Sequence, residues 1–358
     1  MPLGGIIQRG PGIATVEATS VTPQGRITPE DSGLWKDSQI EPLRKVVEFA
    51  HSQNQKIMIQ LGHAGRKAST VAPWLSAGEI AGKDLNGWPD DVWGASAIPW
   101  NDAHATPKEL SLSDIEDLKG AFAASFKRAI QAGFDAIEIH NAHGYLLHSF
   151  LSPVSNQRTD KYGGSFENRT RLSLELVELA RSIMPEDMPL FMRISGTDWL
   201  EEAKDKFPES WTGEDTARLA PLLADAGVDL LDVSSGGNHP DQHPHVKPAY
   251  QAPLAVQAKK AVCDKMLIGS VGSIDSAQLA NDLLEKEGLD LVTIGRGMLK
   301  SYVPLAIDMH ADLYTGFQKN PGLVFQWAED LKVHVQMPNQ IRWGFAGRGS
   351  KDERKPLL

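Results

Sequence analysis

The chain has 358 residues, of which 41% are hydrophobic and 23% charged, and its formal net charge is −10. This is the composition of a globular protein, and the negative charge disfavours nucleic acid and anionic membrane surfaces as partners. The single cysteine, Cys263, excludes a disulfide within the chain and a cysteine-ligated iron–sulfur cluster. No apolar stretch is long enough to cross a bilayer. We therefore predict a cytoplasmic protein that acts on a small molecule.

Short runs rich in Val, Ile and Leu recur along the chain and predict strands that are covered on both faces. In chain order these runs occupy residues 13–18, 57–61, 136–140, 190–194, 230–233, 266–270 and 291–294. Segments with helical spacing lie between them, so the alternation predicts parallel βαβ units. A closed (β/α)8 TIM barrel needs eight strands. The sequence therefore predicts an α/β barrel that lacks its first strand.

Three connections from a helix to a strand share one pattern: Gly, any residue, Asp, and then an apolar run. The glycines are Gly133, Gly227 and Gly288. Because glycine accepts the left-handed conformation that closes a helix, each one is predicted to end a helix. The predicted cap residues at the helix starts are Ser113 with Glu116, Thr212 with Asp215, and Asp275.

The repeat also predicts the domain organisation. Residues 1–320 are predicted to form a single barrel domain, and residues 321–358, which lie outside the repeat, a C-terminal extension. Within the barrel, residues 68–107 show no regular period and carry several tryptophans. Long irregular segments in compact domains are often functional. We predict that this excursion packs over the mouth of the barrel.

The ends of the predicted strands supply the candidate site, since barrel enzymes carry their active sites there. The third strand ends in His140, followed closely by His143 and Tyr145. Two neutral imidazoles can hold a carbonyl or phenolate oxygen, and a tyrosine beside them can donate a proton. Two alternatives stay open for the histidines: a purely structural role, and ligation of a metal together with a carboxylate.

The last two strand ends carry Gly272, Gly295 and Arg296. Such glycines either free backbone N–H groups for a phosphate or simply make tight turns. A second histidine cluster, at residues 239–245, is predicted to be a loop at the surface or the substrate rim rather than a metal site. Lys67 is the lysine nearest to a strand end, but it lies well beyond the apolar run, which disfavours Schiff-base chemistry.

Several blocks of the sequence, taken together, resemble the Old Yellow Enzyme family, in the bacterial-type branch that is also found in fungi. The blocks occur in order between about residues 12 and 304, and the central one is long and specific. They are residues 17–19 with 25–27, 60–67, 140–147, 150–153 with 156–169, and the Gly295-Arg296 pair.

The resemblance implies FMN at the C-terminal rim, with hydride passing from NADPH or NADH through flavin N5 to the β-carbon of an α,β-unsaturated carbonyl compound. It implies that His140 and His143 grip the carbonyl oxygen and that Tyr145 protonates the α-carbon. The residues that it places at FMN are Ala18, Gln60, Arg193, Gly272, Gly295 and Arg296. Those that it places near the substrate are Lys67 and Arg342, the latter reaching into a partner subunit's site if the protein is a homo-oligomer. No metal is implied.

One part of the family pattern is missing from this sequence. Family members begin with a hairpin and a first strand that carries a motif against the flavin, and neither is present here. An N-terminally truncated, flavin-free and non-catalytic relative is therefore the alternative to an active enzyme. A flavin-free barrel isomerase or lyase is a third hypothesis, which the histidine–tyrosine block and Arg193 disfavour.

Overall fold

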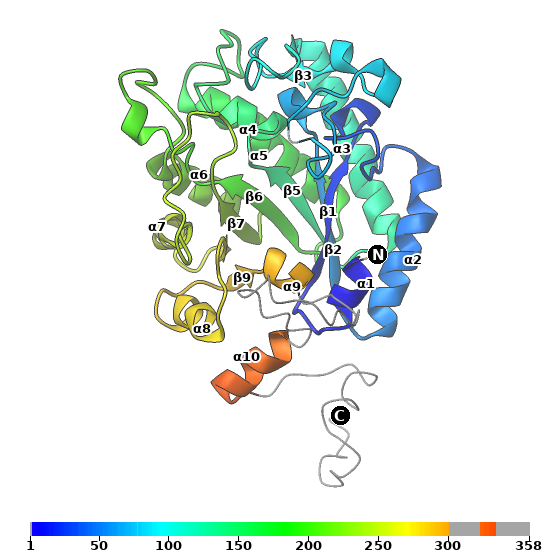
Figure 1. Cartoon of the computed structure of the whole chain (residues 1–358), viewed down its shortest axis with the longest axis vertical. Helices are drawn as coiled ribbons and strands as arrows, with labels where there is room; N and C mark the ends of the chain where they lie inside the picture. The colour runs from blue at the N-terminus through cyan, green and yellow to red at the C-terminus, as the bar shows by residue number, and fades with distance from the viewer. Residues whose placement is uncertain (1, 77, 301–322, 334–358) are drawn as a thin grey trace, which may run out of the picture.

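The computed structural model describes residues 2–76, 78–300 and 323–333. Within these residues, a single parallel sheet contains all of the strands that the apolar runs predict (Figure 1). In spatial order they are β1 (Ala14–Ser20), β2 (Ile57–Gly62), β5 (Ala136–Asn141), β6 (Leu190–Ser195), β7 (Leu230–Ser234), β8 (Leu267–Val271) and β9 (Leu291–Thr293). Two very short strands, β3 (Trp93–Gly94) and β4 (Lys108–Glu109), form a separate pair.

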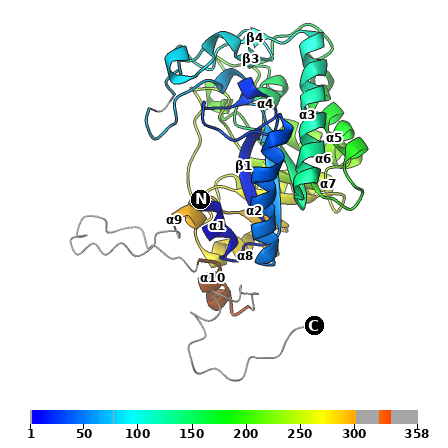
Figure 2. The same cartoon turned by 90° about the vertical axis from the view of Figure 1, so that its right-hand side faces the viewer.

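Most helices cover the outer face of the curled sheet, as Figures 1 and 2 show. They are α2 (Ile40–Ser52), α3 (Leu112–Ala132), α5 (Phe166–Ile183), α6 (Gly213–Ala226), α7 (Ala252–Val262) and α8 (Ala277–Glu285). Other helices lie at the ends of the sheet or beside α8: α1 (Pro2–Ile7), α4 (Leu146–Leu151), α9 (Arg296–Lys300) and α10 (Leu323–Leu331). The main core lies between helices and sheet, where Ile59, Ile137 and Phe122 are fully buried. No helix of the described ranges is both long and apolar enough to span a bilayer.

The sheet is curled but not closed in the part of the chain that the structure describes. Each strand pairs in parallel with its neighbours from β1 through β9, and no pairing joins β9 back to β1 in this part. The architecture is the predicted α/β fold of the TIM-barrel class. Within the described ranges this sheet has seven strands, the number that the sequence predicts.

The repeated Gly-x-Asp connections behave largely as predicted. Gly133 and Gly227 cap α3 and α6 in the left-handed region, with φ of 92° and 110°. Gly288 also has a positive φ, 71°, but α8 ends earlier, with Lys286 at its C-cap. The prediction that Gly288 itself closes the helix is therefore wrong; the glycine instead turns the loop that leads into β9.

The aspartate of each connection has a role that the sequence pattern did not show. Its carboxylate accepts a hydrogen bond from a backbone N–H at the start of the neighbouring strand. The pairs are Asp135 with Ile57 (2.9 Å), Asp229 with Leu190 (2.7 Å) and Asp290 with Ile268 (2.8 Å). Because a one-residue slip would turn every side chain of a strand to the other face, these bonds help to fix the register.

Two of the predicted helix caps lie at other residues. Helix α3 begins at a capping box of Ser111 and Asp114, not at the predicted box of Ser113 and Glu116. The N–H of Asp114 donates to the Ser111 hydroxyl at 3.2 Å, and the N–H of Ser111 donates to the Asp114 carboxylate at 2.8 Å. The sequence contains both boxes two residues apart, and spacing alone did not separate them. Helix α8 is capped by Ser276 rather than Asp275, whereas the box of Thr212 with Asp215 is confirmed.

The irregular excursion of residues 68–107 packs over the C-terminal ends of the strands (Figure 1). Its tryptophans bind loops that follow distant strands: Trp88 donates to the carbonyl of Gln24 at 2.9 Å, and Trp100 donates to that of Gly237 at 3.0 Å. Trp93 stacks on His63 with ring centroids 5.2 Å apart. The domain boundary at residues 320 and 321 falls outside the described residues and stays a prediction.

Candidate active site

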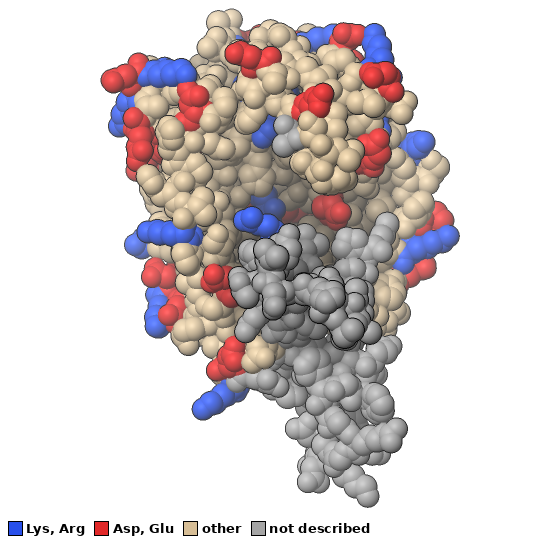
Figure 3. Space-filling view, viewed as in Figure 1, with Lys and Arg blue, Asp and Glu red and all other residues tan. Residues whose placement is uncertain are grey.

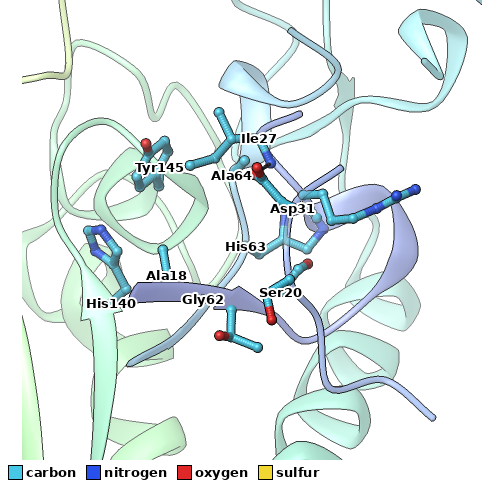
Figure 4. A pocket seen from close by; sticks show the side chains of 13 residues that line it. Ala18, Ser20, Ile27, Asp31, Gly62, His63, Ala64, His140 and Tyr145 are labelled. Atoms are coloured by element: carbon cyan, nitrogen blue, oxygen red, sulfur yellow. Dashed lines mark hydrogen bonds between the residues drawn. The ribbon is translucent and has the colours of Figure 1, made fainter. Parts of the chain in front are cut away.

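Three polar rings meet at the C-terminal end of β5. The ring of His140 lies 5.2 Å from that of His143 and 5.0 Å from that of Tyr145, measured between centroids, and both contacts are edge-on. Figure 4 shows His140 and Tyr145 on one wall of a pocket, with Ala18 of β1 between them and Ile27 beside Tyr145. The cavity volume of this pocket is about 20 Å³. The structure thus brings together all three residues predicted to be catalytic.

The turn that carries two of these rings is held in an uncommon conformation. His143 has φ 61° and Gly144 has φ 72°, both in the left-handed region. A Cβ on Gly144 would lie 2.2 Å from the carbonyl oxygen of Gly237, so only glycine fits there. The N–H of Gly144 donates to Nδ1 of the fully buried His148 at 2.9 Å, and the opposite ring nitrogen lies 3.2 Å from Asp198. The sequence analysis missed this His148–Asp198 pair, which stabilises the turn through the N–H of Gly144.

Burial keeps the three rings neutral. It lowers the pKa of His143 to about 3, helped by the positive charges of Arg193 and Lys67, and it lowers the pKa of His140 in the same direction. Burial also raises the pKa of Tyr145 to about 12. At neutral pH the histidines therefore each carry one ring proton, and the tyrosine keeps its own.

Lys67 joins the same site through its ammonium group. Nζ donates to the carbonyl oxygens of His143 at 2.9 Å and Gly237 at 3.0 Å, and it lies over the rings of Trp100 and Tyr145. Burial, followed by the charge of Arg66, lowers the pKa of Lys67 to about 8. Lys67 thus lies beside Tyr145, and its role near the substrate stays a prediction.

A polar layer lies deeper in the sheet than the three rings and consists of Gln60, Glu138, Arg193 and Asp232. Gln60, Glu138 and Arg193 alternate with core residues of β2, β5 and β6, so they point away from the covering helices. Nε of Arg193 donates to Asp232 on β7 at 2.8 Å, its Nη2 bonds to the same carboxylate oxygen, and Gln60 donates a short bond to Glu138. One carboxylate oxygen of Glu138 and one of Asp232 have no hydrogen-bond partner among the described residues.

Sequence reasoning placed Gln60 and Arg193 at the cofactor but missed Glu138 and Asp232. A signal was present, since each is a single acid inside an otherwise apolar strand, and a buried acid needs a partner. Burial lowers the pKa of Arg193, but the charges of Asp232 and Glu138 outweigh it and raise that pKa above its usual range. Figure 3 shows that this face of the molecule is hollowed at its centre, with basic side chains inside the hollow.

Glu138 makes the stability of the protein depend on pH. Burial, with a contribution from Asp232, raises its pKa to about 7 against the opposing charge of Arg193. The folded protein therefore binds this proton more tightly than the unfolded chain. The stability that the protonated group contributes is fully present below the ordinary pKa of about 4.5 and is lost as the pH rises to about 7.

Replacing Glu138 by glutamine is therefore expected to flatten this dependence. We expect the variant to gain up to about 3 kcal/mol in free energy of unfolding relative to wild type at about pH 8, and almost nothing at about pH 5. Urea denaturation of both proteins at the two pH values measures the difference. An equal effect at both values would show that Glu138 is ionised in the fold throughout.

The remaining predicted cofactor residues lie at other strand ends. Gly272 follows β8 with φ 111°, and a Cβ there would meet Nε2 of Gln251 at 2.3 Å. Gly295 and Arg296 lie after β9, are exposed, and open the short helix α9. Arg342 lies outside the described residues. The structure therefore gathers the histidine–tyrosine group, Lys67 and the polar layer, while the predicted phosphate residues form a separate edge.

The second histidine cluster is a surface feature, as predicted. His243 and His245 are exposed, and His245 pairs with Glu202 at 2.8 Å. Within the described residues, no group of three or more His, Cys, Asp or Glu side chains is arranged to hold a metal ion.

A parallel α/β sheet with a buried polar site at its strand ends defines an enzyme of the TIM-barrel class. The sequence model of the NADH:flavin oxidoreductase / NADH oxidase family matches residues 7–302. The chain belongs to this family, which confirms the predicted relationship to the Old Yellow Enzymes. It is an NAD(P)H-dependent flavin oxidoreductase, with FMN as its cofactor.

Individual relatives agree with this assignment. The chain is 54% identical to an NADH:flavin oxidoreductase of Gibberella zeae over 359 residues, covering 99% of this chain and 82% of that protein. It is 40% identical to the NADPH dehydrogenase of Bacillus subtilis over 290 residues, covering 81% and 77%. The fold is similar to that of morphinone reductase in complex with tetrahydroNAD, with a TM-score of 0.67, 24% identity, and coverage of 94% of this chain and 83% of that one.

Proposed function

We propose that the protein reduces the carbon–carbon double bond of α,β-unsaturated carbonyl compounds, with NADPH or NADH as the source of hydride. When bound, FMN supplies the capacity to accept hydride and to pass it to the β-carbon of the alkene. The observation that carries the proposal is the convergence of two neutral histidines and one protonated tyrosine, whose ring centroids lie 5.0–6.4 Å apart; His140 and Tyr145 line one pocket. This set can hold an oxygen and deliver a proton beside it.

The two histidines would hold the carbonyl oxygen of the substrate. Both imidazoles are neutral, so each has one N–H to donate, and donors placed where negative charge develops lower the barrier. Tyr145 would donate its phenolic proton to the α-carbon. Its raised pKa keeps that proton in place until charge has developed on the substrate. Lys67 would line the substrate side of the pocket.

The polar layer fits the ring of a flavin. Two donors of Arg193 bond to Asp232, and its Nη1 makes no hydrogen bond within the described residues, so it is left for a ligand. This cation would stabilise negative charge on the reduced ring, and Gln60 and Ala18 would contact the ring at neighbouring strand ends. Gly272, Gly295 and Arg296 would hold the phosphate. The buried oxygen atoms without partners indicate that this layer is polar enough to complete its bonding with a polar ligand.

Two further predictions accompany this function. The protein is expected to work in the cytoplasm, and a homo-oligomer in which Arg342 reaches a neighbouring site is left as a prediction. Size-exclusion chromatography with light scattering would measure the oligomeric state.

The visible absorption spectrum of the purified protein tests the proposal most directly. A yellow protein that is bleached by NADPH under nitrogen and regains its colour with 2-cyclohexenone would support both half-reactions. A yellow protein that is bleached but does not respond to enones would refute alkene reduction. A colourless protein that takes up no added FMN would favour the flavin-free, non-catalytic alternative.

A further inference from the structure

One side of the His143 ring is already bonded within the protein. Nε2 of His143 lies 2.7 Å from the hydroxyl oxygen of Ser234, the last residue of β7, which is 5% exposed. The backbone N–H of His143 donates to Ser195 at the end of β6 at 2.8 Å. His143 is therefore held at two strands, through its ring at β7 and through its backbone at β6. Because Nε2 is engaged, Nδ1 is the ring nitrogen that a ligand can reach.

The position of a single proton decides what Nδ1 can do. A neutral imidazole carries hydrogen on one nitrogen and a lone pair on the other. If Nε2 carries the hydrogen and donates to Ser234, Nδ1 presents a lone pair, which repels a carbonyl oxygen. If Ser234 donates to Nε2, the hydrogen is on Nδ1, and His143 can bind that oxygen.

The side chain of Gln251, the N-cap residue of α7, helps to decide which ring nitrogen of His143 carries the hydrogen. Nε2 of Gln251 donates to the carbonyl of Val271 at 2.8 Å, which fixes the orientation of its amide. Its oxygen therefore faces β7, where it accepts a short bond from Ser235 and lies 3.3 Å from the hydroxyl of Ser234. The Ser234 hydroxyl has one hydrogen to give. The Gln251 oxygen, which has two lone pairs, can also accept from Ser234, but at 3.3 Å it is farther from the hydroxyl than the imidazole nitrogen at 2.7 Å, and we assign the hydrogen to the nearer partner.

We propose that Ser234 is a positioning residue, which donates its hydroxyl hydrogen to Nε2 of His143 and thereby fixes the Nδ1–H form of that ring. The longer distance from Ser234 to the oxygen of Gln251 supports this arrangement. Ser234 touches neither substrate nor cofactor in this scheme, and its effect passes entirely through His143. The inference deepens the proposed function and rests on it, because it explains how His143 becomes a donor.

Nitrogen NMR of the FMN-loaded protein, labelled with ¹⁵N-histidine, measures the tautomer directly. The signal of His143 is identified by its loss in His143→Asn. We expect a protonated Nδ1 in the wild type, and in Ser234→Ala a mixture of the two forms or the Nε2–H form. Ser234→Thr, which keeps a hydroxyl, is expected to restore Nδ1–H. A wild-type ring with hydrogen on Nε2, or an unchanged ring in Ser234→Ala, would overturn the proposal.

Ser270→Ala provides the matched control. Ser270 is a fully buried serine on the neighbouring strand β8, and its hydroxyl has no hydrogen-bond partner among the described residues. Its replacement makes the same change in size at a buried site without removing a hydrogen bond to His143. We expect its His143 signal and turnover to match the wild type. Ser234→Ala should instead lower kcat/KM for 2-cyclohexenone about tenfold, the loss of roughly one hydrogen bond, while keeping its flavin spectrum.

The two hypotheses can fail separately. The tautomer can be read by NMR whether or not enones are reduced, so absence of turnover would count against the proposed function alone. Normal turnover with an Nε2–H ring in the wild type would instead count against the role of Ser234 alone. A tautomer that changes equally in Ser270→Ala and Ser234→Ala would also refute it, because general loosening of the core would then be the cause.

Discussion

Replacing His140 by alanine is expected to lower kcat/KM for 2-cyclohexenone by about 10²- to 10³-fold, the usual loss when one donor to a developing oxyanion is removed. His140 is 4% exposed, and its ring lies edge-on to those of both His143 and Tyr145. The variant removes a neutral donor and leaves the cation of the polar layer in place. We therefore expect FMN to stay bound, which the visible spectrum checks, and the reoxidation of reduced flavin by the enone to become slow in stopped-flow measurements.

Two variants sharpen this test. His140→Asn keeps an N–H donor and is expected to retain more activity than His140→Ala. His51→Ala makes the same substitution at an exposed histidine, which bonds to Asp135 near the opposite end of the sheet, and is expected to leave turnover unchanged. If His140→Ala reacted with the enone as fast as the wild type, the ring would have no part in holding the carbonyl oxygen.

Replacing Arg193 by methionine is expected to destabilise the fold by about 3–5 kcal/mol and to abolish tight FMN binding. The side chain is 18% exposed and its partner Asp232 only 3% exposed, so the pair is largely removed from water. Removing the cation leaves a buried carboxylate without its partner, beside Glu138. The shift of the urea midpoint measures the stability change, and the visible spectrum of the protein with added FMN measures cofactor binding.

The double variant Arg193→Met with Asp232→Leu separates the two effects. Since no unpaired charge is left between β6 and β7, and Glu138 can take up a proton near neutral pH, most of the lost stability is expected to return. FMN binding is not expected to return with it, because the cation is still absent. A double variant that is as unstable as Arg193→Met would show that the loss of stability has another cause than the uncompensated carboxylate.

The strands were predictable because each signal is local. A run such as residues 136–140 or 190–194 is apolar because both faces of the strand pack against other parts of the protein, and this requirement is written in consecutive residues. The glycines that follow α3 and α6 are local in the same sense, since a positive φ needs no distant partner. The start of α3 shows the limit: two capping boxes overlap in the sequence, and the register of the whole helix decides between them.

The candidate site was predictable in part, for a related reason. His140, His143 and Tyr145 lie within six residues of each other after one strand, so their proximity follows from the chain itself. Arg193 and Gln60 could be placed because strands that run in parallel end at one rim. The acids that charge this layer, Glu138 and Asp232, were missed although each interrupts an apolar run.

By itself, then, the sequence determined the class of fold, the order of the strands, the family and the three neighbouring residues that the structure brings together in the candidate site. The tertiary structure alone decided which groups bond to which: the pairing of Arg193 with Asp232, the support of the His143 turn by His148, and the contact of Ser234 with His143. The physical reason is one of range. Helix and strand patterns arise from neighbours along the chain, whereas a hydrogen bond depends on distances of a few tenths of an ångström between segments that lie 91 residues apart for His143 and Ser234 and 170 for Lys67 and Gly237.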